Sequence, residues 1–127
     1  MAVDKYADLN RPWSWSSQPR PLGLYKEAPE RYGFYEIGYW IGGEFKPKYG
    51  GRAAGTTLRQ RLRKHFQGSH NPHIQAEAPE GRLWYRYRVL DSRAEARFVE
   101  ALQVIAFEND YEWNDRQEWT QHWALER

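Results

Sequence analysis

Residues 48–66, KYGGRAAGTTLRQRLRKHF, constrain the fold more than any other part of this chain. An aromatic residue followed by two glycines is typical of a strand that ends in a tight backbone path. Thr56 or Thr57 can then cap a helix over residues 58–67. Its apolar side chains recur at helical spacing, so the helix packs on one face through Leu58, Leu62 and Phe66. The chain must therefore join a strand directly to an amphipathic, basic helix.

The remaining periodicities extend this unit into an α+β domain. Residues 33–41, GFYEIGYWI, and residues 45–50 predict two strands, joined by a turn over 42–44 into a hairpin. Pro47 places its strand at a sheet edge or a bulge. Residues 68–81 are polar and predict a loop. Residues 83–90, LWYRYRVL, alternate and predict a third strand.

Two more helices are expected, over residues 93–107 with Ser92 as the cap and over residues 116–125. The order β-β-α-β-α-α predicts a small three-stranded, mainly antiparallel sheet flanked by helices. The length of 127 residues fits one domain. We assign residues 32–127 to that domain and residues 1–31 to a Pro/Trp-rich N-terminal arm packed on it.

Composition narrows the class of protein. The chain has no cysteine, which excludes disulfides and thiolate metal sites. It shows neither the apolar core of a signal peptide nor an apolar run long enough to cross a bilayer. We therefore expect a cytoplasmic protein with no membrane partner. The terminal tryptophans are expected to form a homodimer surface or to complete the core: Trp13, Trp15, Trp119 and Trp123.

Charge is distributed unevenly along the chain. Residues 45–76 contain no acidic residue, although the net charge of the whole chain is only +2. A local basic field of this kind indicates a polyanionic partner, and the alternative is a solvated basic face. The cations of this window are Lys46, Lys48, Arg52, Arg59, Arg61, Arg63 and Lys64.

Three of the polar residues fall where apolar ones are expected. Arg61 and His65 lie one turn apart at the edge of the apolar stripe of the first helix. A partly buried arginine requires an anion, either a carboxylate of the protein or a bidentate phosphate, unless its head reaches water. Glu100 lies in FVEALQVIAF, an almost wholly apolar helix. It is expected to form a salt bridge, for example with Arg61, or to bind a hard divalent cation.

Taken in chain order, these pieces resemble the GIY-YIG nuclease superfamily over residues 31–116. The resemblance rests on Gly33-Phe34-Tyr35, on Tyr49-Gly50-Gly51, on the helix with Arg61 and His65, and on Glu100 and Asn114. It implies a metal-dependent DNA endonuclease that uses a single divalent cation, Mg²⁺ or Mn²⁺. It also implies that Glu100 is the metal ligand and that the catalytic set is Tyr35, Tyr49, Arg61, His65, Glu100 and Asn114.

The chain departs from the family pattern at several points. Phe34 and Gly50 replace isoleucines of the two motifs, the two tyrosines are fourteen residues apart, and Asn109 is an alternative to Asn114. Contacts with DNA are expected from Lys46, Lys48, Gly51, Arg52, Arg59, Arg63 and Lys64.

Three other functions are compatible with the sequence. One is a nucleic-acid-binding module of the same fold without catalysis. A second is a zinc protein that uses His65, His70 and His73, although three histidines without cysteine make a weak motif. The third is a protein-interaction domain that presents tryptophans to a partner.

Overall fold

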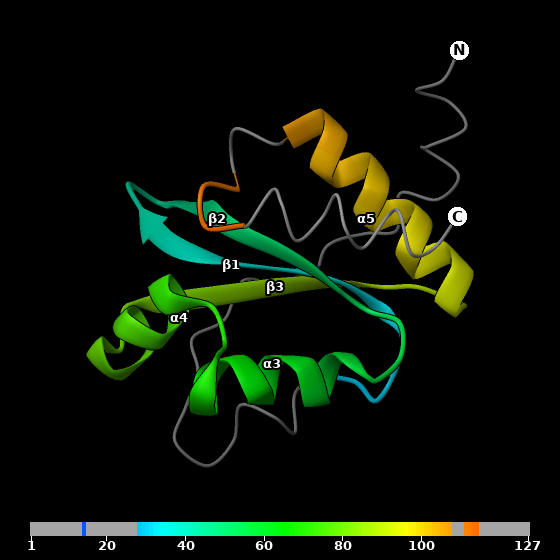
Figure 1. Ribbon diagram of the computed structural model, residues 1–127. Helices are drawn as coiled ribbons and strands as arrows, with labels where there is room; N and C mark the ends of the chain where they lie inside the picture. Colours follow the sequence, from blue (N-terminus) through cyan, green and yellow to red (C-terminus); the bar gives the residue numbers. More distant parts are fainter. Residues whose placement is uncertain (1–13, 15–27, 108–110, 115–127) are drawn as a thin grey trace.

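The computed structural model describes residue 14, residues 28–107 and residues 111–114. Most of the predicted arm over residues 1–31 and the whole predicted helix over residues 116–125 lie outside these ranges. The described part runs β1, β2, α3, α4, a 3₁₀ turn η1, β3 and α5. It is an α+β fold in which one antiparallel sheet lies between helices, as the sequence predicts (Figure 1).

The sheet has the strand order β2-β1-β3, so the first strand of the chain lies in the centre. β1 spans Gly33–Ile41, as predicted, and pairs antiparallel with β2, Glu44–Ala53, and with β3, Leu83–Val89. Gly42 and Gly43 form a two-residue turn with φ of 61° and 79°. Glycine adopts this left-handed backbone without steric cost, which explains the double glycine at the tip of the hairpin.

The second strand is longer than predicted and contains an irregularity. Ile37 pairs with Tyr49, whereas the next residue, Gly38, pairs with Pro47, so Lys48 is the extra residue of a β-bulge. The proline thus stands in an edge strand next to a bulge, as expected from its missing N–H. The bulge takes up one residue of the long hairpin and leaves Tyr49 in register with β1.

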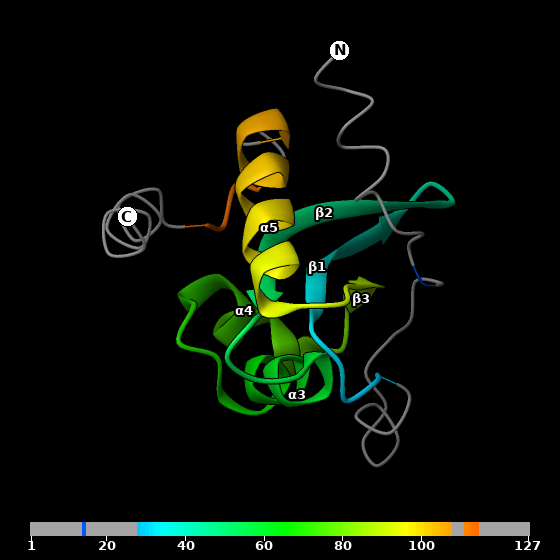
Figure 2. The same ribbon diagram turned by 90° about the vertical axis from the view of Figure 1, so that its right-hand side faces the viewer.

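Helices cover both faces of the sheet. α3, Leu58–Gly68, lies on one face, and α5, Arg93–Phe107, lies on the other (Figure 1 and Figure 2). Thr57 caps α3 in a capping box with Gln60, and the Ser92 hydroxyl accepts a 3.0 Å hydrogen bond from the Glu95 N–H at the start of α5. Both predicted helices are confirmed.

The prediction of a polar loop over residues 68–81 is wrong. This segment contains a short helix, α4, Pro72–Glu77, followed by the 3₁₀ turn Ala78–Glu80. The side-chain oxygen of Asn71, Oδ1, accepts hydrogen bonds from the backbone N–H groups of His73 and Ile74 at 3.0 and 3.2 Å. Pro72 occupies the first turn, where its missing N–H costs nothing. The buried Ile74 then anchors α4 to the core.

Two apolar clusters hold the layers together. The first lies between the sheet and helices α3 and α4, and it includes Tyr35, Ile37, Leu58, Leu62, Ile74 and Tyr85. The second includes Phe34, Leu90, Ala96, Val99 and Tyr111 and secures α5 to the opposite face. Ala28, just before the domain boundary that we predicted, is fully buried in the first cluster. In the described ranges no helix combines the length and apolar character needed to cross a membrane.

Candidate active site

The two tyrosines of the sequence motifs lie side by side on neighbouring strands. Tyr35 of β1 pairs with Gly51 of β2, and the ring centroids of Tyr35 and Tyr49 are 6.2 Å apart. Helix α3 adds His65, whose ring centroid is 5.5 Å from that of Tyr35 and 5.0 Å from that of Tyr49. All three side chains are buried. The long hairpin therefore still brings the predicted residues together.

The position of Tyr35 requires glycine at residue 51. A Cβ atom there would lie 2.5 Å from the Tyr35 hydroxyl oxygen and 2.6 Å from its Cζ atom. Contacts this short are repulsive, since non-bonded atoms settle at about 3.5–4.0 Å. Gly51 thus makes room for the Tyr35 ring to cross the backbone of the edge strand.

The Tyr35 hydroxyl is the centre of a buried hydrogen-bond network. It lies 2.7 Å from His65 Nε2, and that imidazole in turn lies 2.8 Å from the Ser69 hydroxyl. Burial raises the pKa of Tyr35 above its ordinary value, and it outweighs the opposing effect of the Arg61 charge. Tyr35 is therefore a neutral phenol at neutral pH, which suits a supporting role.

Arg61 brings a permanent positive charge to the same hydroxyl groups. The phenolic oxygens of Tyr35 and, to a smaller extent, Tyr49 raise the pKa of its guanidinium, although burial alone would lower it. Its Nε atom is buried and makes no hydrogen bond to any described residue. Within the described ranges Arg61 forms no ion pair, so the salt bridge that the sequence allowed is not seen there. A guanidinium with an unused buried donor is suited to bind an anion.

His65 is held neutral by its surroundings. Burial, followed by the charge of Arg61, lowers its pKa to about 3. Its second ring nitrogen, Nδ1, lies 2.8 Å from the hydroxyl of Ser69, which is itself buried just after α3. The imidazole therefore bridges Tyr35 and Ser69 as a neutral group that carries one proton.

The carboxylate of Glu100 approaches this cluster from α5. Its Oε1 atom accepts a 3.0 Å hydrogen bond from Arg52 Nη1, and both side chains are nearly buried, with exposed fractions of 7% and 11%. The ion pair that the sequence suggested for Glu100 exists, but its partner is Arg52 rather than Arg61. The Glu100 charge also raises the pKa values of Tyr35 and Arg61, although other effects on both groups are larger.

A divalent cation fits the chemistry of Glu100. In the described part of the chain no group of three or more His, Asp or Glu residues could hold a metal ion. A hard cation such as Mg²⁺ retains most of its water and often takes only one or two carboxylates from a protein. A single buried carboxylate such as Glu100 is compatible with that mode of binding.

Asn114 is tied to the second tyrosine motif. Its side-chain oxygen accepts a 2.9 Å hydrogen bond from the Gly50 N–H, and its side-chain nitrogen donates a 2.7 Å bond to the Gly50 carbonyl. The backbone of Trp113 also donates to the Lys48 carbonyl at 2.9 Å. The alternative, Asn109, lies outside the described residues. Asn114 thus fixes the backbone on which Tyr49 and Gly51 stand.

Most of the cations predicted to contact DNA have acidic neighbours in the structure. Lys46 pairs with Glu44 at 2.7 Å, Lys48 with Glu112 at 3.4 Å and Arg59 with Glu30 at 3.0 Å. Arg59 also donates to the Ala28 carbonyl, so it joins α3 to the segment before β1. Arg63 and Lys64 are exposed on α3.

Sequence reasoning missed two groups of polar residues. Ser69 and Asn71 are buried in the segment expected to be a loop, and the Asn71 side chain donates to the Trp113 carbonyl at 2.7 Å. The signal that could have revealed them is Asn-Pro, the signature of a capped helix start. On the other face, buried Glu36 accepts hydrogen bonds from Arg86, at 2.6 Å, and from the Tyr111 hydroxyl. Arg86 is therefore not the open surface charge that alternation alone would indicate.

The histidines do not gather as a zinc site would require. His70 places its ring 5.6 Å from that of His65, but His73 stacks on Trp113 with an interplanar angle of 8°.

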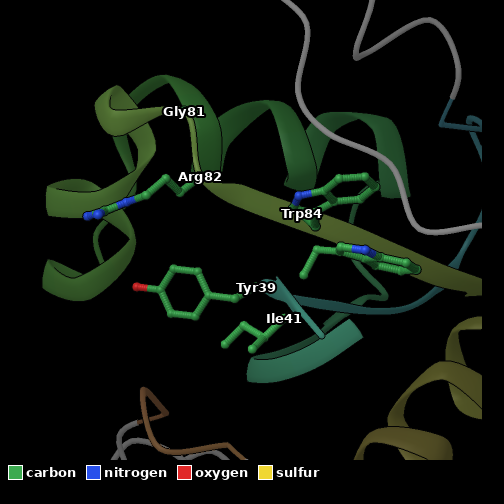
Figure 3. A pocket seen from close by; sticks show the side chains of 6 residues that line it. Tyr39, Ile41, Gly81, Arg82 and Trp84 are labelled. Atoms are coloured by element: carbon green, nitrogen blue, oxygen red, sulfur yellow. The ribbon is translucent and has the colours of Figure 1, made fainter. Parts of the chain in front are cut away.

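A separate open pocket of about 500 Å³ lies at the hairpin end of the sheet (Figure 3). It is lined by Tyr39, Trp40, Ile41, Gly81, Arg82 and Trp84, which include none of the predicted site residues.

Comparison with known proteins supports the fold. No protein-family model matches the chain, and no curated protein matches it either. Two solved structures of the GIY-YIG N-terminal endonuclease domain of UvrC from Thermotoga maritima do match, with TM-scores of 0.54 and 0.53 and sequence identities of 26% and 23%. Each match covers 72% of this chain and 91% of the other. Both are point mutants, tyrosine to phenylalanine, bound to the catalytic divalent cation. The chain therefore has the fold of the GIY-YIG endonuclease domains.

Proposed function

We propose that this protein is a metal-dependent endonuclease that hydrolyses phosphodiester bonds of DNA. The observation that carries the proposal is the buried cluster of Tyr35, Tyr49 and His65, in which both tyrosine hydroxyl groups interact electrostatically with Arg61 and that of Tyr35 also with Glu100. These residues come from β1, β2, α3 and α5, so the fold alone does not require them to meet. The solved structures with this fold are endonuclease domains bound to a divalent cation.

Each residue type suits one part of the hydrolysis. The Arg61 guanidinium would bind the scissile phosphate and stabilise the negative charge that develops on it. Tyr49 would orient the attacking water and, as a phenolate favoured by the charge of Arg61, accept its proton. Tyr35 and His65 would then hold Tyr49 and Arg61 in place. Asn114 would position the backbone of the Tyr49 motif.

Glu100 would hold the divalent cation, Mg²⁺ or Mn²⁺. When bound, such an ion supplies Lewis-acid stabilisation of the phosphoryl and leaving oxygens. In this structure Glu100 forms an ion pair with Arg52. Arg52 and the metal ion would therefore share the Glu100 carboxylate, or the metal ion would replace Arg52 on it.

The predicted DNA-contacting cations can take part without a large energetic cost. Exposed ion pairs contribute only about 0–1 kcal/mol, so Lys46, Lys48 and Arg59 could exchange their carboxylates for phosphates. Arg63 and Lys64 would extend the same basic surface along α3. Arg52 differs from them because its pair with Glu100 is nearly buried.

A cleavage assay tests the proposal. The protein is incubated with supercoiled plasmid in Mg²⁺, in Mn²⁺ and in EDTA, and nicked and linear products are measured. We expect cutting only with the metals. Loss of a preorganised charged group typically costs about 10²–10³-fold in rate, which is the loss expected for Arg61→Ala and Glu100→Gln.

Glu112→Gln is the matched control, because it removes an exposed carboxylate that pairs with Lys48. It should cut at nearly the wild-type rate. The proposal fails if the folded Arg61→Ala and Glu100→Gln proteins cut as fast as wild type. Salt-dependent DNA binding without cutting would instead identify a non-catalytic binding module, and no binding at low salt would favour a protein-interaction domain.

A further inference from the structure

Ser69 lies at the end of a buried hydrogen-bond chain that starts at the tyrosine cluster. The chain runs from the Tyr35 hydroxyl to His65 Nε2, at 2.7 Å, and from His65 Nδ1 to the Ser69 hydroxyl, at 2.8 Å. Tyr35, His65 and Ser69 are exposed by only 0%, 2% and 4%. Water is thus largely excluded from these three side chains, and their hydrogen bonds must be satisfied within the protein.

The backbone of Asn71 fixes the Ser69 end of this row of hydrogen bonds. The Asn71 N–H donates to the Ser69 hydroxyl oxygen at 3.1 Å, so that oxygen already accepts one hydrogen bond. A serine hydroxyl also carries one proton of its own, which needs an acceptor when it is buried. Within the described residues, His65 Nδ1 is the acceptor that lies within reach.

The proton count then selects one tautomer of His65. If Nδ1 carried the imidazole proton, Ser69 would accept two hydrogen bonds while its own proton stayed buried without an acceptor. If Ser69 donates to Nδ1, every group is satisfied, and the proton of the neutral imidazole lies on Nε2. That Nε2–H then donates to the oxygen of Tyr35.

We infer that Ser69 is a positioning residue that holds His65 in the Nε2–H tautomer and thereby makes the Tyr35 oxygen a hydrogen-bond acceptor, with the Tyr35 proton turned away from His65. Because the Tyr35 oxygen accepts from His65 Nε2–H, its own proton must point to another side, and the Tyr49 ring lies on one such side with its centroid 6.2 Å from that of Tyr35. A Tyr35 proton that is turned away from His65 is available to stabilise the phenolate form of Tyr49, the form that can take a proton from water and become a neutral phenol. This consequence rests on the proposed function, whereas the tautomer does not.

The tautomer can be measured without any activity. Nitrogen-15 NMR of the imidazole distinguishes a protonated ring nitrogen from an unprotonated one, and His65 is assigned by the loss of its signals in His65→Gln. At neutral pH we expect the wild-type protein to carry the proton on Nε2. A proton on Nδ1 would show that Ser69 is an acceptor and would overturn the inference.

Variants test the role of the hydroxyl. Ser69→Ala removes the donor and should move His65 toward a mixture of the two tautomers, whereas Ser69→Thr restores the hydroxyl and should restore the wild-type spectrum. Threonine tolerates the extended backbone of residue 69, where φ is −63° and ψ is 141°. Ser92→Ala, which removes a helix-capping hydroxyl on α5, is the matched control and should leave the His65 signals unchanged.

Cleavage rates complete the test. The energy of one buried neutral hydrogen bond corresponds to about a 3- to 10-fold rate loss for Ser69→Ala, with recovery in Ser69→Thr. An unchanged tautomer in Ser69→Ala, or a wild-type cleavage rate despite a changed tautomer, would contradict the positioning role. If no variant and no wild-type protein cuts DNA, the proposed function fails, and the NMR spectra still decide the tautomer.

Discussion

Gly51→Ala is the most informative single substitution, because one methyl group tests the geometry of the tyrosine cluster. The new Cβ atom would lie 2.5 Å from the Tyr35 hydroxyl oxygen and 2.6 Å from Cζ, about 1 Å closer than normal contact. Tyr35 is fully buried and bonded to His65, so it cannot retreat without breaking that bond. The perturbation therefore reaches His65 through Tyr35.

The expected magnitude follows from three contributions. Overpacking a core costs about 1–3 kcal/mol, and loss of the Tyr35–His65 hydrogen bond adds about 1 kcal/mol. Replacing glycine in a strand returns about 0.5–1 kcal/mol of backbone entropy. We expect a net loss of about 2 kcal/mol in the free energy of unfolding. For a domain of this size that loss lowers the melting temperature by about 6–10 °C.

Thermal and urea unfolding measure this loss, and Gly68→Ala is the control. A Cβ atom at Gly68 meets nothing within 4 Å, and this glycine ends α3 with an ordinary φ. Alanine there should be neutral or stabilise the protein by up to about 1 kcal/mol. Equal melting temperatures for Gly51→Ala and Gly68→Ala would refute the reasoning. In Gly51→Ala/Tyr35→Phe the hydroxyl clash is absent but the Cζ clash remains, so recovery should be partial.

Three further outcomes are expected. Arg52→Met should destabilise the fold by about 3 kcal/mol in urea unfolding, because it removes the ion-pair partner at 3.0 Å from the nearly buried Glu100 carboxylate. Lys46→Met, which breaks an exposed pair, should cost less than about 1 kcal/mol. Tyr111→Phe should cost about 2 kcal/mol by the same assay, since it removes a hydrogen bond to the buried Glu36 carboxylate. Because the pKa of His65 falls from 6.5 to about 3 on folding, the unfolded chain binds the extra proton between these values. Stability should therefore be complete above pH 6.5 and decline as pH falls toward 3, and His65→Gln should flatten this decline.

Local patterns predicted the elements whose signals are strong. Aromatic residues between glycines gave the bounds of β1, and a capped apolar stripe gave α3 with Arg61 and His65 turned inward. The same spacing placed His65 correctly because helical periodicity holds over two turns. The register of Tyr49 followed less directly, since it depends on the bulge at Lys48.

The missed features depend on contacts that a local pattern does not contain. α4 has six residues and one buried apolar side chain, too few to produce a period. The sequence suggested Arg61 as a partner of Glu100 and did not identify Arg52, because the residues that pair are 48 positions apart in the chain. Ser69, by contrast, lies only four residues after His65, and it was missed because residues 68–81 were predicted to be a polar loop.

The contacts that secure Gly50 also protect the protein from self-association. β2 is an edge strand, and an edge exposes unpaired backbone groups that can template pairing with another chain. The amide of Asn114 occupies the N–H and carbonyl of Gly50, and the Trp113 N–H occupies the carbonyl of Lys48. At the opposite edge, Ser14 occupies the N–H and carbonyl of Tyr87. Both borders of the sheet are thus closed to aggregation by strand addition at these positions.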